Sequence, residues 1–264
     1  MKLPQLALSG CLLVSIALIV QADQFGDFTY TTNDAGITIT GYTGTGGAVA
    51  IPGTIEGVPV TRIGDLLFAF NTNITSITIP ENVTGIDAEV FARCVNLRSV
   101  SIPNGVTNIG TGAFYYCLSL TSLTIPATVS NIGVRAFASC TNLQGVFFKG
   151  SAPKATTVFY FTDTVSAYYL PGITGWTNTF GGRPAVLWNP LAQTGDGSFG
   201  MGTNGFGFNI TGTTNIPIVV EAAPDVVGGH WVPLLTNTIA TGSVYFSDPD
   251  WTNRPARFYR IRSP

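Results

Sequence analysis

The amino-acid sequence predicts a mainly β protein: a solenoid with one strand per coil of about 23 residues and with β caps, followed by a small β-sandwich-like module. The first observation is a repeat in which five apolar registers recur at one constant interval, the bulkiest being Phe68, Phe91, Phe114 and Phe137. Such a period is typical of solenoids, because each unit buries its apolar face only by stacking on a neighbour. The second observation is composition: 10% of the residues are charged, against about 25% in ordinary soluble domains. The third is a series of five short strand-like segments after residue 206, separated by turn residues.

Each regular repeat combines one strand with two sharp bends. In the segment 97–103, apolar side chains alternate with serines, which is the pattern of a half-buried strand. Pro103 ends this strand, because proline donates no hydrogen bond to a sheet. Gly110 marks the second bend, and residues 111–114 are predicted to form a short helical or 3₁₀ turn whose Phe114 fills the core.

The order of these positions resembles the BspA-type leucine-rich repeats, which are found in surface proteins of bacteria and protists and have the same repeat length. The repeats match in a leucine, an Ile-Pro pair, an Ile-Gly pair, an Ala-Phe pair and a cysteine, as at Leu97, 102–103, 109–110, 113–114 and Cys117. The resemblance covers roughly residues 49–148. It implies a curved solenoid, an extracellular or cell-surface location and a role in adhesion or ligand binding. The resemblance does not imply an enzymatic activity, and it supplies no set of binding residues.

The segments around the repeats predict six parts of the chain. They are a signal peptide (1–22), an N-terminal cap hairpin (23–48), the leucine-rich-repeat solenoid (49–148), a C-terminal cap of the solenoid (149–189), a Gly-rich linker (190–205) and the β-sandwich-like accessory module (206–264). The hairpin is expected because alternating segments flank the turn 33–36. Its position is that of a capping element, which covers the open end of a repeat stack.

The N-terminus predicts secretion. Lys2 precedes an almost wholly apolar run, Leu6 to Val20, and a cleavage site is expected after Ala22. Two alternatives stay open: an uncleaved anchor, and a lipidated Cys11 in a lipobox-like sequence. No other segment approaches the length of a membrane span, so none is expected after cleavage. The low net charge of -2 gives no footprint for nucleic acid.

Three cysteines, Cys94, Cys117 and Cys140, are separated by the same interval as the phenylalanines. We expect them to form a ladder of small, buried packing residues. Neighbouring coils are close enough that their spacing does not forbid a disulfide, but an odd number leaves one thiol unpaired. A metal site needs ligands that converge on a point, and a linear ladder does not converge.

Residues with catalytic or cofactor-binding potential are scattered. His230 is the single histidine, and every cysteine lies in another predicted part of the chain. The glycines of 195–200 spell G-x-G-x-x-G, but no strand-to-helix context surrounds them. Asp248 and Asp250 provide too few ligands for calcium, and the arginines at 254–262 are interpreted as a solvated strand edge. We therefore assign no catalytic, cofactor-binding or metal residue and expect no cofactor.

One surface is a candidate binding face. The outward positions of three successive predicted strands carry hydroxyls: Ser76, Thr78, Ser99, Ser101, Ser122 and Thr124. The next repeat places Gly145 and Phe147 at the same positions. Stacked strands lie about 4.8 Å apart, so the hydroxyls are expected to form two columns on a flat, uncharged face. The alternatives are that Ser and Thr merely suit exposed strand positions, or that the columns bind ice.

These observations favour a secreted or cell-surface leucine-rich-repeat protein that binds a macromolecule or mediates adhesion without catalysis. The expected partner is an extracellular protein or glycan. One alternative is a structural spacer attached to the surface through its C-terminal module. The other is an extracellular hydrolase whose active site the sequence does not reveal; a clustered pair of acidic residues beside a tryptophan would favour it.

Overall fold

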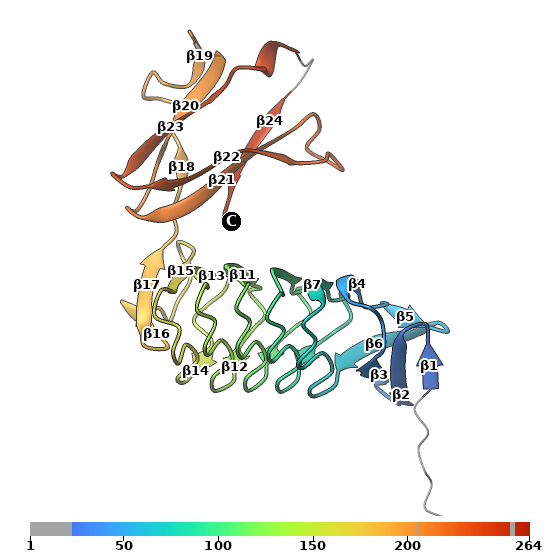
Figure 1. The fold of residues 1–264 in the computed structure, drawn as a ribbon. Helices are drawn as coiled ribbons and strands as arrows, with labels where there is room; N and C mark the ends of the chain where they lie inside the picture. Colours follow the sequence, from blue (N-terminus) through green and yellow to red (C-terminus); the bar gives the residue numbers. More distant parts are fainter. Residues whose placement is uncertain (1–22, 204, 254–256) are drawn as a thin grey trace, which may run out of the picture.

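A computed structural model describes residues 23–203, 205–253 and 257–264. The expected signal peptide and Cys11 lie outside these residues. The described chain forms a solenoid, followed by a C-terminal module of two small antiparallel sheets (Figure 1). Within the described ranges, no helix is long and apolar enough to cross a membrane.

Two walls of parallel strands run along the solenoid. One wall contains β3 (Gly36–Tyr42), β6 (Val58–Ile63), β8 (Gly85–Ile86), β10 (Asn108–Ile109), β12 (Asn131–Ile132) and β14 (Lys154–Ala155). The opposite wall contains β4 (Gly47–Ala50), β7 (Ile74–Thr78) and β9 (Ser99–Ser101), then β11 (Ser122–Ile125), β13 (Gly145–Phe148), β15 (Ser166–Tyr169) and β17 (Arg183–Leu187). We call the outward surface of this second wall the strand face.

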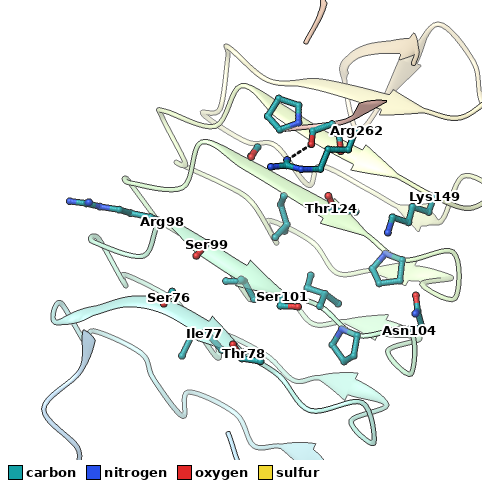
Figure 2. A pocket seen from close by; sticks show the side chains of 18 of the residues that line it. Ser76, Ile77, Thr78, Arg98, Ser99, Ser101, Asn104, Thr124, Lys149 and Arg262 are labelled. Carbon is teal, nitrogen blue, oxygen red and sulfur yellow. Dashed lines mark hydrogen bonds between the residues drawn. The ribbon is translucent and has the colours of Figure 1, made fainter. Parts of the chain in front are cut away.

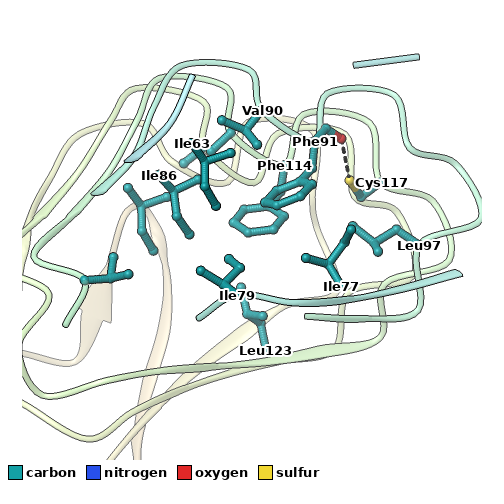
Figure 3. Packing of buried hydrophobic residues seen from close by; sticks show 14 of the residues in the cluster. Ile63, Ile77, Ile79, Ile86, Val90, Phe91, Leu97, Phe114, Cys117 and Leu123 are labelled. Carbon is teal, nitrogen blue, oxygen red and sulfur yellow. Dashed lines mark hydrogen bonds between the residues drawn. The ribbon is translucent and has the colours of Figure 1, made fainter. Parts of the chain in front are cut away.

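A column of phenylalanine rings fills the space between the walls. Phe68, Phe91, Phe114, Phe137 and Phe159 are each at most 1% exposed, and successive rings stack with centroids 5.1–5.7 Å apart. Figure 3 shows two of these rings beside the isoleucines of the β3–β14 wall. The constant period therefore arises because each coil contributes one ring to a continuous apolar core.

The repeats continue beyond residue 148, which corrects the predicted end of the solenoid. Phe159 follows Phe137 after an interval one residue shorter than the regular one, and β14 and β15 extend the two walls in register. The shorter coil shifts the pattern, so a search at the fixed interval of the earlier repeats loses it. The solenoid has about six coils rather than the four to five expected.

The predicted helical turn at 111–114 is also corrected. Two hydrogen-bonded turns replace it, with backbone bonds from Ala113 to Gly110 and from Tyr115 to Gly112. Gly112 and Tyr116 adopt left-handed backbone angles, with φ of 59° and 62°. A left-handed residue prevents the next turn of a right-handed helix, so the chain folds back at each of these positions.

A hairpin closes the N-terminal end of the solenoid. β2 (Phe28–Asn33) pairs with β3 in antiparallel fashion, and β1 (Asp23–Phe25) adds to β2. β3 then pairs in parallel with β6, so the hairpin extends one wall. Tyr42 packs on the first ring of the phenylalanine column, which covers the open end of the core. The short strand β5 (Thr54–Ile55) folds back on β6 in the longer first coil.

The C-terminal module consists of two antiparallel sheets that share an apolar cluster. One contains β18 (Leu191–Ala192), β19 (Gly200–Gly202), β20 (Gly205–Thr211) and β23 (Ser243–Asp248); the other contains β21 (Ile216–Ala223), β22 (Val232–Ile239) and β24 (Phe258–Arg262). A 3₁₀ turn, η1 (Trp251–Asn253), follows β23, and β16 (Thr179–Phe180) pairs with β17 at the solenoid end. The assignment of this module as a β-sandwich stays a prediction.

Candidate binding groove on the strand face

The predicted hydroxyl columns lie on the strand face. In β7, β9 and β11 the inward side chains Ile77, Val100 and Leu123 pack on the core. Strand alternation therefore turns their neighbours outward. Ser76 pairs with Ser99 and Thr78 with Ser101 across β7 and β9. Ser122 and Thr124 hold the corresponding positions in β11, where they pair with Gly145 and Phe147.

All six predicted residues line one groove of about 680 Å³. Its floor is the strand face of three successive coils, and the C-terminal residues Arg262, Ser263 and Pro264 complete its wall. Figure 2 shows labelled hydroxyl residues along the strands and Arg262 at the upper end of the view, beyond Thr124. The face is thus hollowed rather than flat, and two parts of the chain far apart in sequence build it.

Charged side chains border this groove, which corrects the expectation of an uncharged face. Arg98 and Lys149 are exposed at its edge, and Glu81 is the carboxylate side chain among its lining residues. The guanidinium of Arg262 donates to Glu221 at 2.6 Å and to the carbonyl of Ser263 at 2.6 Å. Cationic groups therefore outnumber carboxylates around the neutral hydroxyl floor.

The groove continues into an apolar hollow of about 270 Å³. The column that begins with Thr78, Ser101 and Thr124 changes there to Phe147 and Tyr168. These two rings stack with centroids 4.8 Å apart, and the edge of Trp188 faces Phe147 at 6.4 Å. Along this column, hydroxyls over three coils are thus followed by aromatic rings over the next two, and these rings line the hollow.

The same aromatic residues hold the C-terminal module. Phe147 and Tyr168 belong to the apolar cluster of the module rather than to the solenoid core. The indole nitrogen of Trp188 donates to the carbonyl of Pro217 at 2.8 Å, and the hydroxyl of Tyr168 donates to the carbonyl of Asn215 at 3.4 Å. This burial raises the pKa of Tyr168. Trp188 therefore joins the two parts of the protein.

The sequence analysis missed these docking residues, although a signal was present. In β7, β9 and β11 the outward positions of the hydroxyl columns are Ser or Thr, whereas Gly145 and Phe147 replace them in the β13 coil. A large aromatic side chain at an outward strand position needs cover from water. This change marks the place where the module covers the strand face.

The cysteines form the predicted ladder and are free thiols. Cys94, Cys117 and Cys140 each donate from Sγ to the carbonyl of the phenylalanine one coil earlier, at 3.0–3.1 Å. Burial raises the pKa of Cys94 and Cys140 to about 12, and that of Cys117 well above its ordinary value. Thr162 takes the place of the cysteine in the shorter coil, and its hydroxyl donates to the carbonyl of Phe137 at 2.7 Å. The ladder is therefore a structural hydrogen-bonding position.

Arg257, Arg260 and Arg262 differ from the predicted solvated edge, and Arg254 of that cluster lies outside the described residues. Arg260 and Arg262 form ion pairs with Glu221, which is 4% exposed, and Arg257 forms one with the buried Asp248. Burial alone would raise the pKa of Glu221, but the hydrogen bonds from the two arginines outweigh it and lower the pKa. These arginines hold the module together, and Asp248 is committed to Arg257.

The remaining candidate residues are exposed in a loop or take part in hydrogen bonds that hold a loop. His230 is exposed in the loop before β22. In the Gly-rich segment, Asp196 accepts hydrogen bonds from Ser198 and from the side chain of Asn209 on β20, which anchors the loop. Among the described residues, no group of three His, Cys, Asp or Glu side chains converges in a way that could hold a metal ion.

Comparisons with known proteins found one family model and several solved structures that are similar to parts of this chain. Residues 61–175 match the BspA type leucine-rich repeat region in six copies. A leucine-rich repeat protein of T. pallidum is 22% identical over 58% of this chain and 87% of its own, with a TM-score of 0.45. One from Bacteroides capillosus is 31% identical over 49% of this chain and 99% of its own, with a TM-score of 0.42. The pneumococcal vaccine antigen PcpA is 14% identical over 61% of this chain and 48% of its own, with a TM-score of 0.44.

No curated protein matches the chain. The repeat model and the stacked coils nevertheless agree on the same segment, with its phenylalanine column and its cysteine ladder. Through residues 61–175, the chain belongs to the BspA-type leucine-rich repeat family.

Proposed function

We propose that the protein binds an extracellular macromolecule in the strand-face groove and does not alter it chemically. The observation that carries this proposal is the gathering of all six predicted hydroxyl residues in one groove of about 680 Å³. A groove of this size lies within the range of about 300–1,000 Å³ that is usual for ligand sites. The partner is a protein or glycan segment, because the groove is open along the strand face.

The chemistry of the groove favours an extended chain over a compact ligand. A neutral hydrogen bond contributes about 0.5–1.5 kcal/mol net, so useful affinity requires contacts with several rows of hydroxyls. The rows recur on β7, β9 and β11, and the apolar hollow follows in the same direction. Arg98 and Lys149 add cationic contacts at the edge, so some dependence on salt is expected.

The lining of the groove supports binding more than hydrolysis. Glycoside hydrolases generally use a pair of carboxylic acids about 5–10 Å apart. Among the described residues that line the groove and the adjoining hollow, Glu81 is the one acidic side chain. The tryptophan of this region, Trp188, has no acidic pair beside it in those linings and instead bonds to Pro217.

Two lysine substitutions test the groove directly. Ser99→Lys together with Ser101→Lys would fill the middle of the floor with long cationic side chains. Both serines are exposed, so the melting temperature should stay within about 2 °C of the parent, because surface substitutions usually change stability by less than 0.5 kcal/mol. The purified protein and this variant would be applied to arrays of extracellular-matrix proteins and glycans. The matched control is Thr111→Lys, which adds a lysine at an exposed position just after β10, on the opposite wall.

The expected result is at least one array ligand that the parent and Thr111→Lys bind and that the double variant loses. Binding that survives in the double variant would contradict a site in the groove. Product release from the bound glycan or protein would favour the hydrolase alternative. Deletion of the C-terminal module is not a suitable test, because Arg262, Ser263 and Pro264 line the groove themselves.

We also propose that the protein acts outside the cell. The apolar N-terminal segment and the resemblance to surface proteins support this location. Expression of the full chain in a bacterial host, followed by N-terminal sequencing of the released protein, tests it. A mature N-terminus at Asp23 is expected. Retention of the apolar segment in a membrane fraction would indicate the anchor, and a lipid on Cys11 would indicate the lipoprotein alternative.

A further inference from the structure

A second surface lies along the turns that contain the left-handed residues. Each coil from Leu66 onward has two such positions, and we call their surface the turn edge. One column contains Leu66, Glu89, Gly112, Arg135 and Thr157, and the other contains Phe70, Arg93, Tyr116, Ser139 and Phe161. Backbone hydrogen bonds join adjacent coils in the second column, from Arg93 to the carbonyl of Tyr115 and from Tyr116 to that of Ala138.

The residues of the turn edge adopt a backbone conformation that is unfavourable for side chains with a Cβ. A left-handed angle disfavours residues with a Cβ by roughly 1–2 kcal/mol each, and glycine avoids this cost. Only Gly112 uses that option among the ten positions, while Phe70, Tyr116 and Phe161 are bulky aromatic residues with φ of 56–64°. Strained positions of this kind gather at functional sites.

Aromatic surface is exposed along this edge. Phe70 is 65% exposed and Phe161 is 63% exposed, at the two ends of their column. Tyr160 and Tyr116 are 44% and 36% exposed. The rings of Tyr160 and Phe161 adjoin each other with centroids 4.1 Å apart. The aromatic residues therefore form an open stripe, in contrast to Phe147 and Tyr168, which the module covers.

Two arginines lie between these rings. The guanidinium of Arg93 is 5.2–5.6 Å from the ring centroids of Phe70, Tyr115 and Tyr116, and that of Arg135 is 5.4 Å from the ring of Tyr160. In the described part of the chain, the ion pairs involve other arginines. Ring stacking thus holds the guanidinium groups in place while their charge remains open to an anion.

We propose that the turn edge is a binding site for an acidic polysaccharide, distinct from the groove. Aromatic faces pack on the C–H faces of sugar rings, and a planar guanidinium bonds a carboxylate or sulfate through two parallel N–H donors. Coils stack about 4.8 Å apart, so rings and arginines recur along an extended chain. Glu89 is the one acidic residue in the two columns. Of the carboxylates beside them, Asp65 accepts from the backbone N–H of Ala88 and Asp87 pairs with Arg62.

The test measures binding to two acidic polymers and to their uncharged counterparts. Polygalacturonate is compared with its methyl ester, and dextran sulfate with dextran. The variant is Arg93→Gln with Arg135→Gln, which removes both charges and keeps long side chains. The matched control is Lys154→Gln, since Lys154 is an exposed cationic residue on β14 and belongs neither to the groove lining nor to the two columns. A second variant, Phe70→Ala with Phe161→Ala, removes the exposed rings. A further variant, Arg98→Gln, removes a charge at the edge of the groove and shows whether the polymer binds there instead.

The parent protein should bind at least one acidic polymer, bind its neutral counterpart at least tenfold more weakly, and lose affinity as salt rises. Both turn-edge variants should weaken binding at least tenfold, and Lys154→Gln should leave it unchanged. Binding of neither acidic polymer, or equal binding of the neutral forms, would overturn the proposal. If Arg98→Gln weakens binding and the turn-edge variants do not, the acidic polymer binds in the groove instead. Self-association that only the phenylalanine variant abolishes, without polymer binding, would identify a contact between copies instead.

Discussion

At the scale of single residues, each coil repeats the same buried environment. The central ring of a coil contacts the ring before it and the ring after it, as Phe114 does between Phe91 and Phe137. The cysteine of the next coil donates to the carbonyl of this phenylalanine. A change at one of these positions therefore affects two interfaces between coils.

Phe114→Ala is expected to lower the free energy of unfolding by about 3–5 kcal/mol, because it leaves a cavity in the middle of the ring column. Thermal and denaturant melting measure this loss. Phe70→Ala is the matched control, since Phe70 follows the column ring Phe68 closely in sequence but is 65% exposed. Equal stability of the two variants would show that the ring column does not stabilise the solenoid.

The thiols are expected to be inert in the folded protein. Burial raises the pKa of Cys94 and Cys140 to about 12, so the reactive thiolate is almost absent at pH 8. Iodoacetamide at pH 8 should leave Cys94, Cys117 and Cys140 unmodified in the native state and modify all three in denaturant without a reductant. Peptide mass spectrometry distinguishes this result from a disulfide, which would block two of the three.

Thr162 indicates which replacement a position of the cysteine ladder tolerates. Cys117→Thr keeps a donor for the carbonyl of Phe91, as Thr162 keeps one for Phe137. Cys117→Val has nearly the same shape but removes the donor, and it should be less stable than Cys117→Thr by about 1 kcal/mol. The two melting curves test this difference. A valine variant at least as stable as the threonine variant would show that packing alone decides the position.

At the scale of the elements, the bends after the β8–β14 wall bring adjacent coils into backbone contact. A Cβ on Gly110 would lie 2.5 Å from the carbonyl carbon and oxygen of Asp87 in the preceding coil. Asp87 itself occupies the glycine register of its coil and bonds to Arg62 through both carboxylate oxygens at 2.8 Å. The glycine is thus required by close approach of the backbone rather than by an unusual φ.

Gly110→Ala should therefore destabilise the solenoid by about 1–3 kcal/mol, the usual cost of inserting a methyl group into a packed site. Gly53→Ala is the control, because the nearest atom to its Cβ would be Pro80 Cβ at 3.7 Å. Urea unfolding of both proteins measures the contrast. An unchanged midpoint for Gly110→Ala would show that the coils separate easily at this bend.

At the scale of the whole molecule, the C-terminal module covers the aromatic end of the strand face. Its cluster includes Phe147 and Tyr168 of the solenoid together with Ile216 and Ile218 of β21. The end of β24 brings Arg262 to the edge of the groove. The module is therefore part of the candidate binding site, which argues against the repeats being only a spacer.

Phe147→Thr restores the hydroxyl pattern of the column and should weaken docking of the module. The ring that stacks on Tyr168 is lost, so the module should separate more readily and the connection between β17 and β18 should be cleaved faster by protease. Phe161→Thr, the same change at an exposed ring, is the control. Limited proteolysis and small-angle scattering measure the effect. Equal cleavage rates would show that other contacts hold the module.

The sequence by itself determined the solenoid, its period, the buried rings and cysteines, and the outward hydroxyls. These features are local or recur at a fixed interval, so the spacing of apolar residues is sufficient to recognise them. The sequence analysis did not recognise the shorter coil, because its register shifts by one position at Phe159.

Only the tertiary structure decided where the module docks, that Arg262 and Ser101 line the same groove, and that Arg93 lies near three rings. Glu221 and its arginines are 39 and 41 residues apart in sequence. Such contacts join segments with no common period, and they depend on how completed sheets pack against each other. The module docks through burial of apolar surface between preformed elements, and the ion pairs and cation–π contacts form only between side chains that the packed sheets bring together. Sequence spacing does not encode this packing.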